Sequence, residues 1–277
     1  MIIPPAAAEP IFHIGDFFIT NSMVNGWIAV GFFVIVSFFI RRAAKGRVPH
    51  GLHNAAEAIV EFFLSEMEKV TGDRKRARQF LPLVGTIFLF LLFSNWIGLL
   101  PGTGSIGIYE LIHGQIELIP ILRPAASDLN LTLAIALFAV LMTHIFGFMT
   151  LGVVNHASKF VNLRGIIQAF KKGPIAVAVA FVEFAVGLIE IVGEVAKMLS
   201  LSLRLFGNIF AGEVLITVML GLAAFVVPIP FMLLELLVGI IQATVFAMLT
   251  LAYLTVATTG HGEGTEGEEG AHAPAHA

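Results

Sequence analysis

At residues 197–208 the chain reads Lys-Met-Leu-Ser-Leu-Ser-Leu-Arg-Leu-Phe-Gly-Asn, which places Arg204 inside a long apolar segment. An arginine side chain stays charged at every physiological pH. A fixed charge near the middle of a bilayer costs at least about 2.5 kcal/mol on insertion scales. A membrane segment that keeps such a residue either pairs it within the protein or uses it. For an intramembrane arginine we favour a functional role over a purely structural ion pair.

The composition indicates a polytopic membrane protein. Of the 277 residues, 57% are hydrophobic and only 13% are charged, against about 25% charged in ordinary soluble domains. The chain contains no cysteine, which excludes disulfides and thiolate metal sites. We expect no metal site and no cofactor.

The apolar runs predict an all-α protein with five membrane crossings. Residues 23–40, 83–100 and 130–154 are each long enough to cross a bilayer. The last apolar region extends from Pro174 to about residue 259, and Pro228 and Pro230 divide it into two helices. It contains only seven charged residues, which are Glu183, Glu190, Glu194, Lys197, Arg204, Glu213 and Glu235.

The basic residues of the loops predict the orientation. Nine lie between the first and second spans, and Arg123 is the only one between the second and third spans. Four more lie between the third span and Pro174. Basic loops stay in the cytoplasm, so we expect residues 1–22 outside and the C-terminus inside. The membrane domain is predicted at 23–257, and 258–277 is predicted to be a disordered cytoplasmic tail because it is rich in Gly, Glu, Ala and His.

Residues 55–70 have the pattern of an amphipathic helix rather than of a span. Ile59, Phe63, Met67 and Val70 recur at helical spacing, and glutamates occupy the other side. We expect this helix to lie on the cytoplasmic membrane interface; a soluble loop helix is the alternative.

The last two helices are predicted to be long, tilted and antiparallel. About 50 residues separate Pro174 from the proline turn, which is roughly 75 Å of helix at about 1.5 Å per residue. A hydrocarbon layer is only about 30 Å thick, so the helix must tilt, extend beyond the layer, or both.

Charged residues approach Arg204 along two faces of its helix. At about 100° per residue, Glu190, Glu183 and Lys197 lie within about 60° of Arg204 and toward its cytoplasmic end. Glu213 lies on the opposite face and toward the outer end. An antiparallel register that pairs Glu213 with Glu235 also brings Gln242 close to Arg204. A simple interhelical hydrogen bond is the alternative role of Gln242.

These residues resemble the signature of subunit a of the bacterial F-type ATP synthase. The resemblance extends from about residue 10 to 257 and rests on Leu203-Arg204-Leu205-Phe206-Gly207-Asn208, Ala211-Gly212-Glu213, Gln242-Ala243, Asp128-Leu129-Asn130 and Asn95-Trp96-Ile97-Gly98-Leu99-Leu100-Pro101. The arginine motif is the most specific of these.

The resemblance implies a proton-channel stator in a bacterial inner membrane, without catalytic activity of its own. Its partners would be the c-ring, the peripheral-stalk b subunits, the F1 ATPase head and lipid, with no nucleic acid. Arg204 would face the c-subunit carboxylate, and Glu213 would lie on the outer access path near Asn208 and Gln242. Glu190 would correspond to a cytoplasmic-side carboxylate. Glu235 occupies a position where many bacterial relatives have histidine, which puts a histidine relay in doubt.

Several alternatives stay open. The coupling ion could be sodium instead of the proton. An autonomous channel or a secondary transporter is a less favoured class, since no repeated halves are visible. Further candidate half-channel residues are Glu183, Glu194, Lys197, Asp128 and His144. Asp128 either caps the third span or lines the outer entrance, and His144 is either an interhelical residue or part of a relay.

Overall fold

The structure is a computed structural model that describes residues 5, 7–43, 51–100, 102–112, 115–160, 174–222 and 226–259. The predicted tail from residue 260 onward and most of the basic loop around 159–172 lie outside these residues. The described helices are α1 (Asn21–Ala43), α2 (Leu52–Thr71), α3 (Arg74–Gly98), α4 (Leu129–Leu151), α5 (Val153–Phe160), α7 (Pro174–Leu222) and α8 (Pro228–Thr258).

Five of these helices are long and apolar enough to cross a membrane, namely α1, α3, α4, α7 and α8. The predicted all-α class with five crossings is therefore confirmed. Two boundaries differ from the apolar runs. Helix α3 begins at Arg74, nine residues before the predicted span, because Asp73 accepts a hydrogen bond from the Lys75 amide at 2.9 Å and caps it. Helix α4 ends before Gly152, whose φ of 82° cannot continue a helix.

Helix α2 covers the segment for which the amphipathic pattern predicts a helix. It packs on α3 through Leu64 and Met67, which are buried, and through Phe63, whose ring lies 4.7 Å from that of Phe88. Ile59 and Val70 stay exposed. They leave α2 with apolar surface for a membrane interface.

Two short β-hairpins were not predicted. Strands β1 (Pro10–Ile14) and β2 (Phe17–Thr20) pair antiparallel, as do β3 (Gly107–Ile112) and β4 (Gln115–Pro120). The single-turn helices η1 (Thr103–Ser105) and η2 (Ala125–Ser127) flank the second hairpin. The first hairpin precedes the first apolar run and the second lies between two runs, and hydropathy gives no strand signal in either segment.

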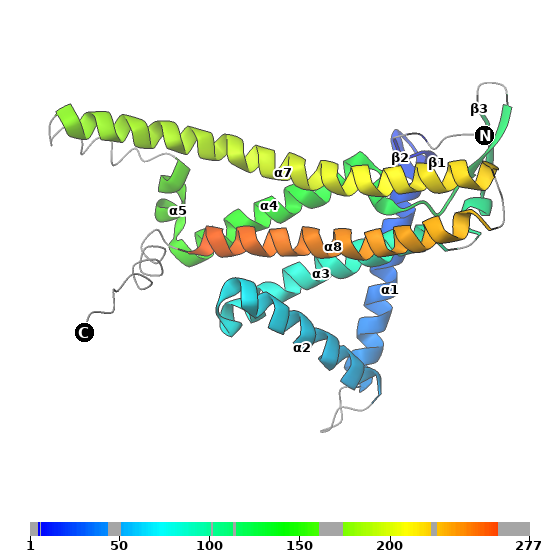
Figure 1. Ribbon diagram of the computed structural model, residues 1–277, viewed down its shortest axis with the longest axis horizontal. Helices are drawn as coiled ribbons and strands as arrows, with labels where there is room; N and C mark the ends of the chain where they lie inside the picture. Colours follow the sequence, from blue (N-terminus) through cyan, green and yellow to red (C-terminus); the bar gives the residue numbers. More distant parts are fainter. Residues whose placement is uncertain are drawn as a thin grey trace, which may run out of the picture. The chain divides into compact units, whose positions relative to one another are not determined.

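The chain forms two compact units. The first consists of Met1–Leu137 and Leu199–Leu251, and the second of Phe138–Met198 and Ala252–Ala277. Within the first unit, the C-terminal part of α7 and the N-terminal part of α8 run antiparallel and side by side (Figure 1). At 49 residues α7 is about 73 Å long, which confirms the predicted long final helices.

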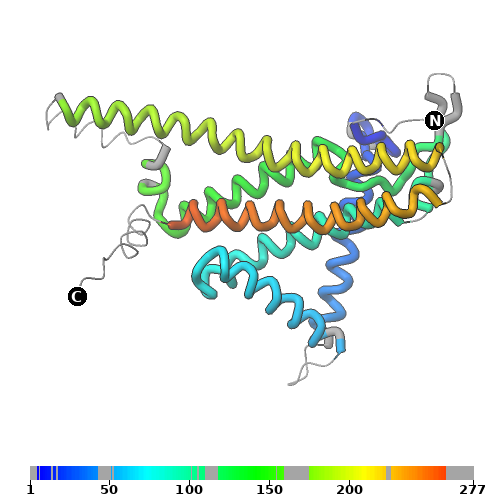
Figure 2. Tube along the Cα trace, viewed as in Figure 1, coloured from blue at the N-terminus to red at the C-terminus, as the bar shows by residue number. Residues whose placement is uncertain are grey.

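Segments far apart in sequence meet at one end of the first unit. In Figure 2 the blue N-terminal hairpin, the green segment that follows β4 and the yellow end of α7 come together there. Hydrogen bonds join them: Asn21 Nδ2 donates to the Pro120 carbonyl at 3.3 Å, and Arg123 contacts Glu213. This end contains most of the candidate outer-path residues.

Candidate functional site

Arg204 lies on an exposed face of α7 in the first unit. Its Nη2 donates to the Ser200 hydroxyl one turn earlier, at 3.4 Å. Among the residues that the structure describes, no carboxylate forms an ion pair with it. Glycine or alanine occupies 207 and 211 on the same exposed face. A second helix could therefore approach Arg204 closely.

Gln242 contacts Asn208 rather than Arg204. Its Oε1 accepts a hydrogen bond from Asn208 Nδ2 at 2.8 Å across the α7–α8 pair. The hydrogen bond is interhelical, which was the alternative role of Gln242, and it pairs Gln242 with the residue one helical turn after Arg204. The reason is geometric: residues four apart lie on the same helix face, so a register read from charges alone cannot separate the two pairings.

Glu235 is a buried carboxylate on α8 that packs against a glycine of α7. Only 6% of Glu235 is exposed. A Cβ atom on Gly212 would overlap the Glu235 carboxylate as it is placed here, so a side chain at position 212 would displace it. Within the described part of the chain, Glu235 Oε1 has no hydrogen-bond partner. An unpaired buried carboxylate is uncommon, and it marks Glu235 as a candidate for proton exchange.

Two cavities of the first unit share Glu235. The larger, of about 540 Å³, is also lined by Glu213, Arg123 and Glu9, and by the ends of α7 and α8. The smaller, of about 360 Å³, is also lined by Asn208 and Gln242. Glu235 therefore lies between the larger cavity and the Asn208–Gln242 pair. Asn208 itself is one turn from Arg204 along α7.

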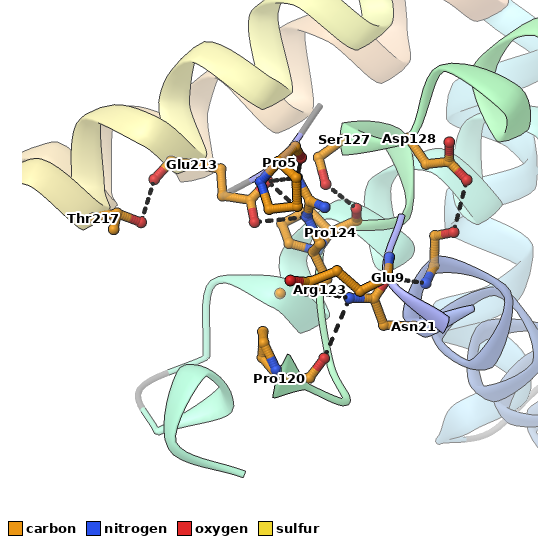
Figure 3. A network of polar contacts seen from close by, with 12 residues as sticks. Pro5, Glu9, Asn21, Pro120, Arg123, Pro124, Ser127, Asp128, Glu213 and Thr217 are labelled. Atoms are coloured by element: carbon orange, nitrogen blue, oxygen red, sulfur yellow. Dashed lines mark hydrogen bonds and ion pairs between the residues drawn. The ribbon is translucent and has the colours of Figure 1, made fainter. Parts of the chain in front are cut away.

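Glu213 lines the larger cavity, and its direct partner is Arg123. Arg123 Nε lies 2.8 Å from Glu213 Oε1, and Arg123 Nη2 lies 3.0 Å from Oε2 (Figure 3). Arg123 follows β4 and is 2% exposed. Because the planar guanidinium of Arg123 contacts both carboxylate oxygens of Glu213, the two groups form a bidentate pair.

Asp128 caps α4. Its Oδ1 accepts a hydrogen bond from the Asn130 amide at 3.0 Å, and its Oδ2 accepts one from the Ser22 hydroxyl at 2.8 Å. Asp128 is buried and is not part of the lining of the larger cavity. Of the two roles left open, the cap is the one with direct contacts.

The second unit gathers the candidate residues that we expected on the cytoplasmic side. Glu194 lies 2.7 Å from Lys197 Nζ and 3.6 Å from His144 Nε2. His144 Nδ1 is 3.3 Å from His156 Nε2, and Lys197 lies over the Tyr253 ring. Glu190 is half-buried and Glu183 is exposed earlier on α7, and neither is a lining residue of the two cavities described above.

Three polar residues of these clusters were not predicted from the sequence. Arg123 had a detectable signal, since it is the lone basic residue between the second and third spans. His156 follows the third span by two residues and resembled an ordinary loop residue. Glu9 lies in a segment without periodicity, and hydrogen bonds with Asn21 hold it at the site.

The comparisons with known proteins point to one family. A family profile described as "ATP synthase A chain" matches residues 23–255. ATP synthase subunit a of Moorella thermoacetica is 33% identical over 252 residues, which cover 91% of this chain and 96% of that protein. The Gloeobacter violaceus subunit is 34% identical over 87% of the chain and 85% of its own length. The Mycobacterium ulcerans subunit is 35% identical over 86% of each.

Proposed function

This chain belongs to the ATP synthase A chain family and is thus a multi-pass membrane component of that complex, and we propose that it is the stator which offers two offset proton half-channels to a rotating c-ring. The observation that carries the proposal is the position of Arg204. It lies exposed on α7 with no carboxylate partner among the described residues, one turn from the Asn208–Gln242 pair. A fixed charge in that position suits an acidic partner that passes by.

In this mechanism the outer half-channel begins at the larger cavity. A proton enters beside Glu213, is taken up by Glu235, and passes the Asn208–Gln242 pair to a carboxylate of the c-ring. The sharing of Glu235 by both cavities supports this order. A neutral c-ring carboxylate can then rotate into lipid, because protonation avoids the cost of a bare charge there.

Arg204 keeps the two half-channels apart. Its charge attracts each ionised c-ring carboxylate as it returns and repels a proton that would pass directly between the paths. Every charge that crosses the membrane supplies about 2.3 kcal/mol per 100 mV. Several such steps drive the rotation that the F1 head converts to ATP.

The cytoplasmic half-channel is assigned to the second unit. Glu194, Lys197 and His144 form a polar cluster there, and Glu190 and Glu183 lie on the preceding turns of α7. The proton leaves through this side after nearly a full turn of the ring. The peripheral-stalk b subunits would hold the stator against the torque, with the N-terminus outside a bacterial inner membrane and the C-terminus in the cytoplasm.

Arg204→Ala is the decisive test. With the charge gone, a protonated c-ring carboxylate can move between the half-channels without a full rotation. Purified mutant complex in vesicles should lose ATP-driven pumping at least about tenfold, as expected when a group essential for proton transfer is removed, and should gain a passive proton leak. The leak should vanish when the c-ring carboxylate is also neutralised. Arg204→Lys keeps the charge but loses the planar fork, and should still pump poorly.

A matched control is Arg78→Gln, which removes an exposed arginine of α3 and should leave pumping unchanged. An Arg204→Ala complex that pumps normally without added leak would show that the charge is structural only. The same vesicles test the coupling ion. Pumping in sodium-free medium supports the proton, whereas a strict need for sodium supports the alternative.

A further inference from the structure

Arg123 belongs to no part of the mechanism above, yet it heads the fully buried side chains of the described residues in size. It precedes Pro124 in the segment between β4 and η2, and its own carbonyl accepts a hydrogen bond from Asn25 Nδ2 on α1 at 2.5 Å. The backbone around it is thus tied to a transmembrane helix. A buried guanidinium needs partners for all its donors.

The guanidinium of Arg123 divides its donors between two targets. Nε and Nη2 contact the Glu213 carboxylate on α7 at 2.8–3.1 Å. Nη2 also donates to the Pro5 carbonyl at 2.7 Å, and Nη1 donates to the Ala7 carbonyl at 3.2 Å. One side chain therefore joins α7 to the N-terminal segment (Figure 3).

The N-terminal segment has a second attachment two residues further on. Asn21 Nδ2 donates to Glu9 Oε2 at 3.3 Å, and the Glu9 amide donates to Asn21 Oδ1 at 3.3 Å. The Asn21 amide donates to the Glu9 carbonyl at 3.1 Å. Glu9 also lines the larger cavity with Glu213 and Glu235. This segment is thus held beside the cavity from both ends.

We propose that Arg123 is a positioning residue of the outer half-channel, which fixes the Glu213 carboxylate and, through Pro5 and Ala7, holds the N-terminal segment so that Glu9 forms part of the wall of the larger cavity. The proposal rests on the half-channel function of that cavity. Both Glu213 oxygens are engaged by Arg123, whereas Glu235 Oε1 has no partner among the described residues. Glu213 then serves as a fixed anion at the mouth, and Glu235 is the group that takes up the proton.

A double-mutant cycle in the complete ATP synthase tests the first half of the proposal. Arg123→Gln, Glu213→Gln and the double variant are compared by ATP synthesis per assembled c-ring, driven by an imposed pH gradient in vesicles. Arg123→Gln should lower synthesis about tenfold or more, because Glu213 is then left as an unpaired buried anion. The double variant should be no slower than Glu213→Gln alone, because residues that act as one unit are not additive.

Two further readouts separate positioning from a loss of fold. The outer proton concentration for half-maximal synthesis should change in Arg123→Gln, while ATP hydrolysis by the head and co-isolation of the c-ring stay normal. Arg123→Lys, which keeps one charge but loses the fork, should fall between wild type and Arg123→Gln. Arg78→Gln is the matched control.

The wall is tested with single cysteines, since the chain has none of its own. A bulky maleimide added from the outer side should slow synthesis by several-fold in Ala7→Cys. It should have no effect in Asp16→Cys, which lies exposed at the turn between β1 and β2. Equal rates of ATP synthesis in the two labelled variants would contradict the proposal that the N-terminal segment forms part of the cavity wall.

The outcomes also distinguish this proposal from the half-channel itself. Normal synthesis in Arg123→Gln beside a slow Glu213→Gln variant would overturn the positioning role and leave the half-channel intact. A double variant whose fold-loss of synthesis equals the product of the two single losses would also overturn the positioning role and leave the half-channel intact. If Arg204→Ala and Glu213→Gln both retain full coupling, the half-channel function itself fails.

Discussion

At the scale of single residues, the outer path depends on a close fit between one glycine and one carboxylate. Glu235 fills space that any side chain at position 212 would occupy. Its burial removes it from bulk water, yet it lines two cavities of the first unit. A carboxylate in such a place can exchange a proton without competing with bulk solvent.

Gly212→Ala should therefore impair the outer path without removing a titratable group. The added methyl group displaces Glu235, and overpacking of this kind costs about 1–3 kcal/mol. We expect proton-driven ATP synthesis to fall about tenfold, which corresponds to roughly 1.4 kcal/mol in rate. Measurement in vesicles normalised to c-ring content checks this.

The controls for this prediction come from the same chain. Glu235→Asp shortens the side chain by one methylene, so the Gly212→Ala/Glu235→Asp variant should recover part of the rate. Gly85→Ala on α3 places its Cβ at an ordinary 3.7 Å from Leu81 and should be neutral. A Gly212→Ala complex with a normal rate would contradict the role of this fit.

Glu213 and Glu235 can also be neutralised together. Replacement of both by Gln should slow synthesis more than either single change, because one carboxylate at the mouth and one between the cavities are then both lost. Assembly should survive, since the c-ring face of α7 is untouched, and co-isolation of the ring measures this. Unchanged synthesis in the double variant would refute an inlet at this cavity.

At the scale of elements, α7 and α8 are held by helices that flank them. Trp96 on α3 donates from Nε1 to the Leu236 carbonyl of α8 at 3.2 Å. Thr132 on α4 hydrogen-bonds Ser202 on α7 at 3.2 Å. One contact lies next to Glu235 in sequence and the other lies two residues before Arg204, so they help to fix the register of α7 and α8.

Helices α4 and α7 are also linked in the second unit, through His144 and Glu194. If His144 is an interhelical residue, His144→Gln should keep synthesis within about twofold of wild type, because a glutamine can still hydrogen-bond across helices. A relay needs a group that titrates, and histidine does so near physiological pH. A loss in His144→Gln as deep as in His144→Leu would therefore favour the relay.

At the scale of the whole molecule, orientation in the membrane follows from the distribution of basic residues. Five described helices can cross a membrane, and an odd number of crossings places the termini on opposite sides. The basic loops predict which side is which. On that prediction, the half-channel mechanism requires the cavity lined by Arg123 and Glu213 to open toward the outside.

Single cysteines test this topology. Substitutions at Lys45 and Lys171 should react with an impermeant thiol reagent only from the cytoplasmic side, and one at Gln115 only from outside. The absence of native cysteine makes each label unique. Reaction of positions 45 and 115 from the same side would contradict five crossings.

The sequence by itself determined the class, the number of crossings and the family. Charge is so costly in hydrocarbon that uncharged runs of about 20 residues mark spans without any knowledge of packing. Arg204 and its neighbours were singled out for the same reason. Only the tertiary structure decided which residues meet: Gln242 with Asn208, Glu235 with Gly212, and Glu213 with Arg123. Such pairs depend on helix rotation and on loops folded against helix ends. Hydropathy carries no information on either, because a shift of one helical turn leaves the apolar pattern unchanged.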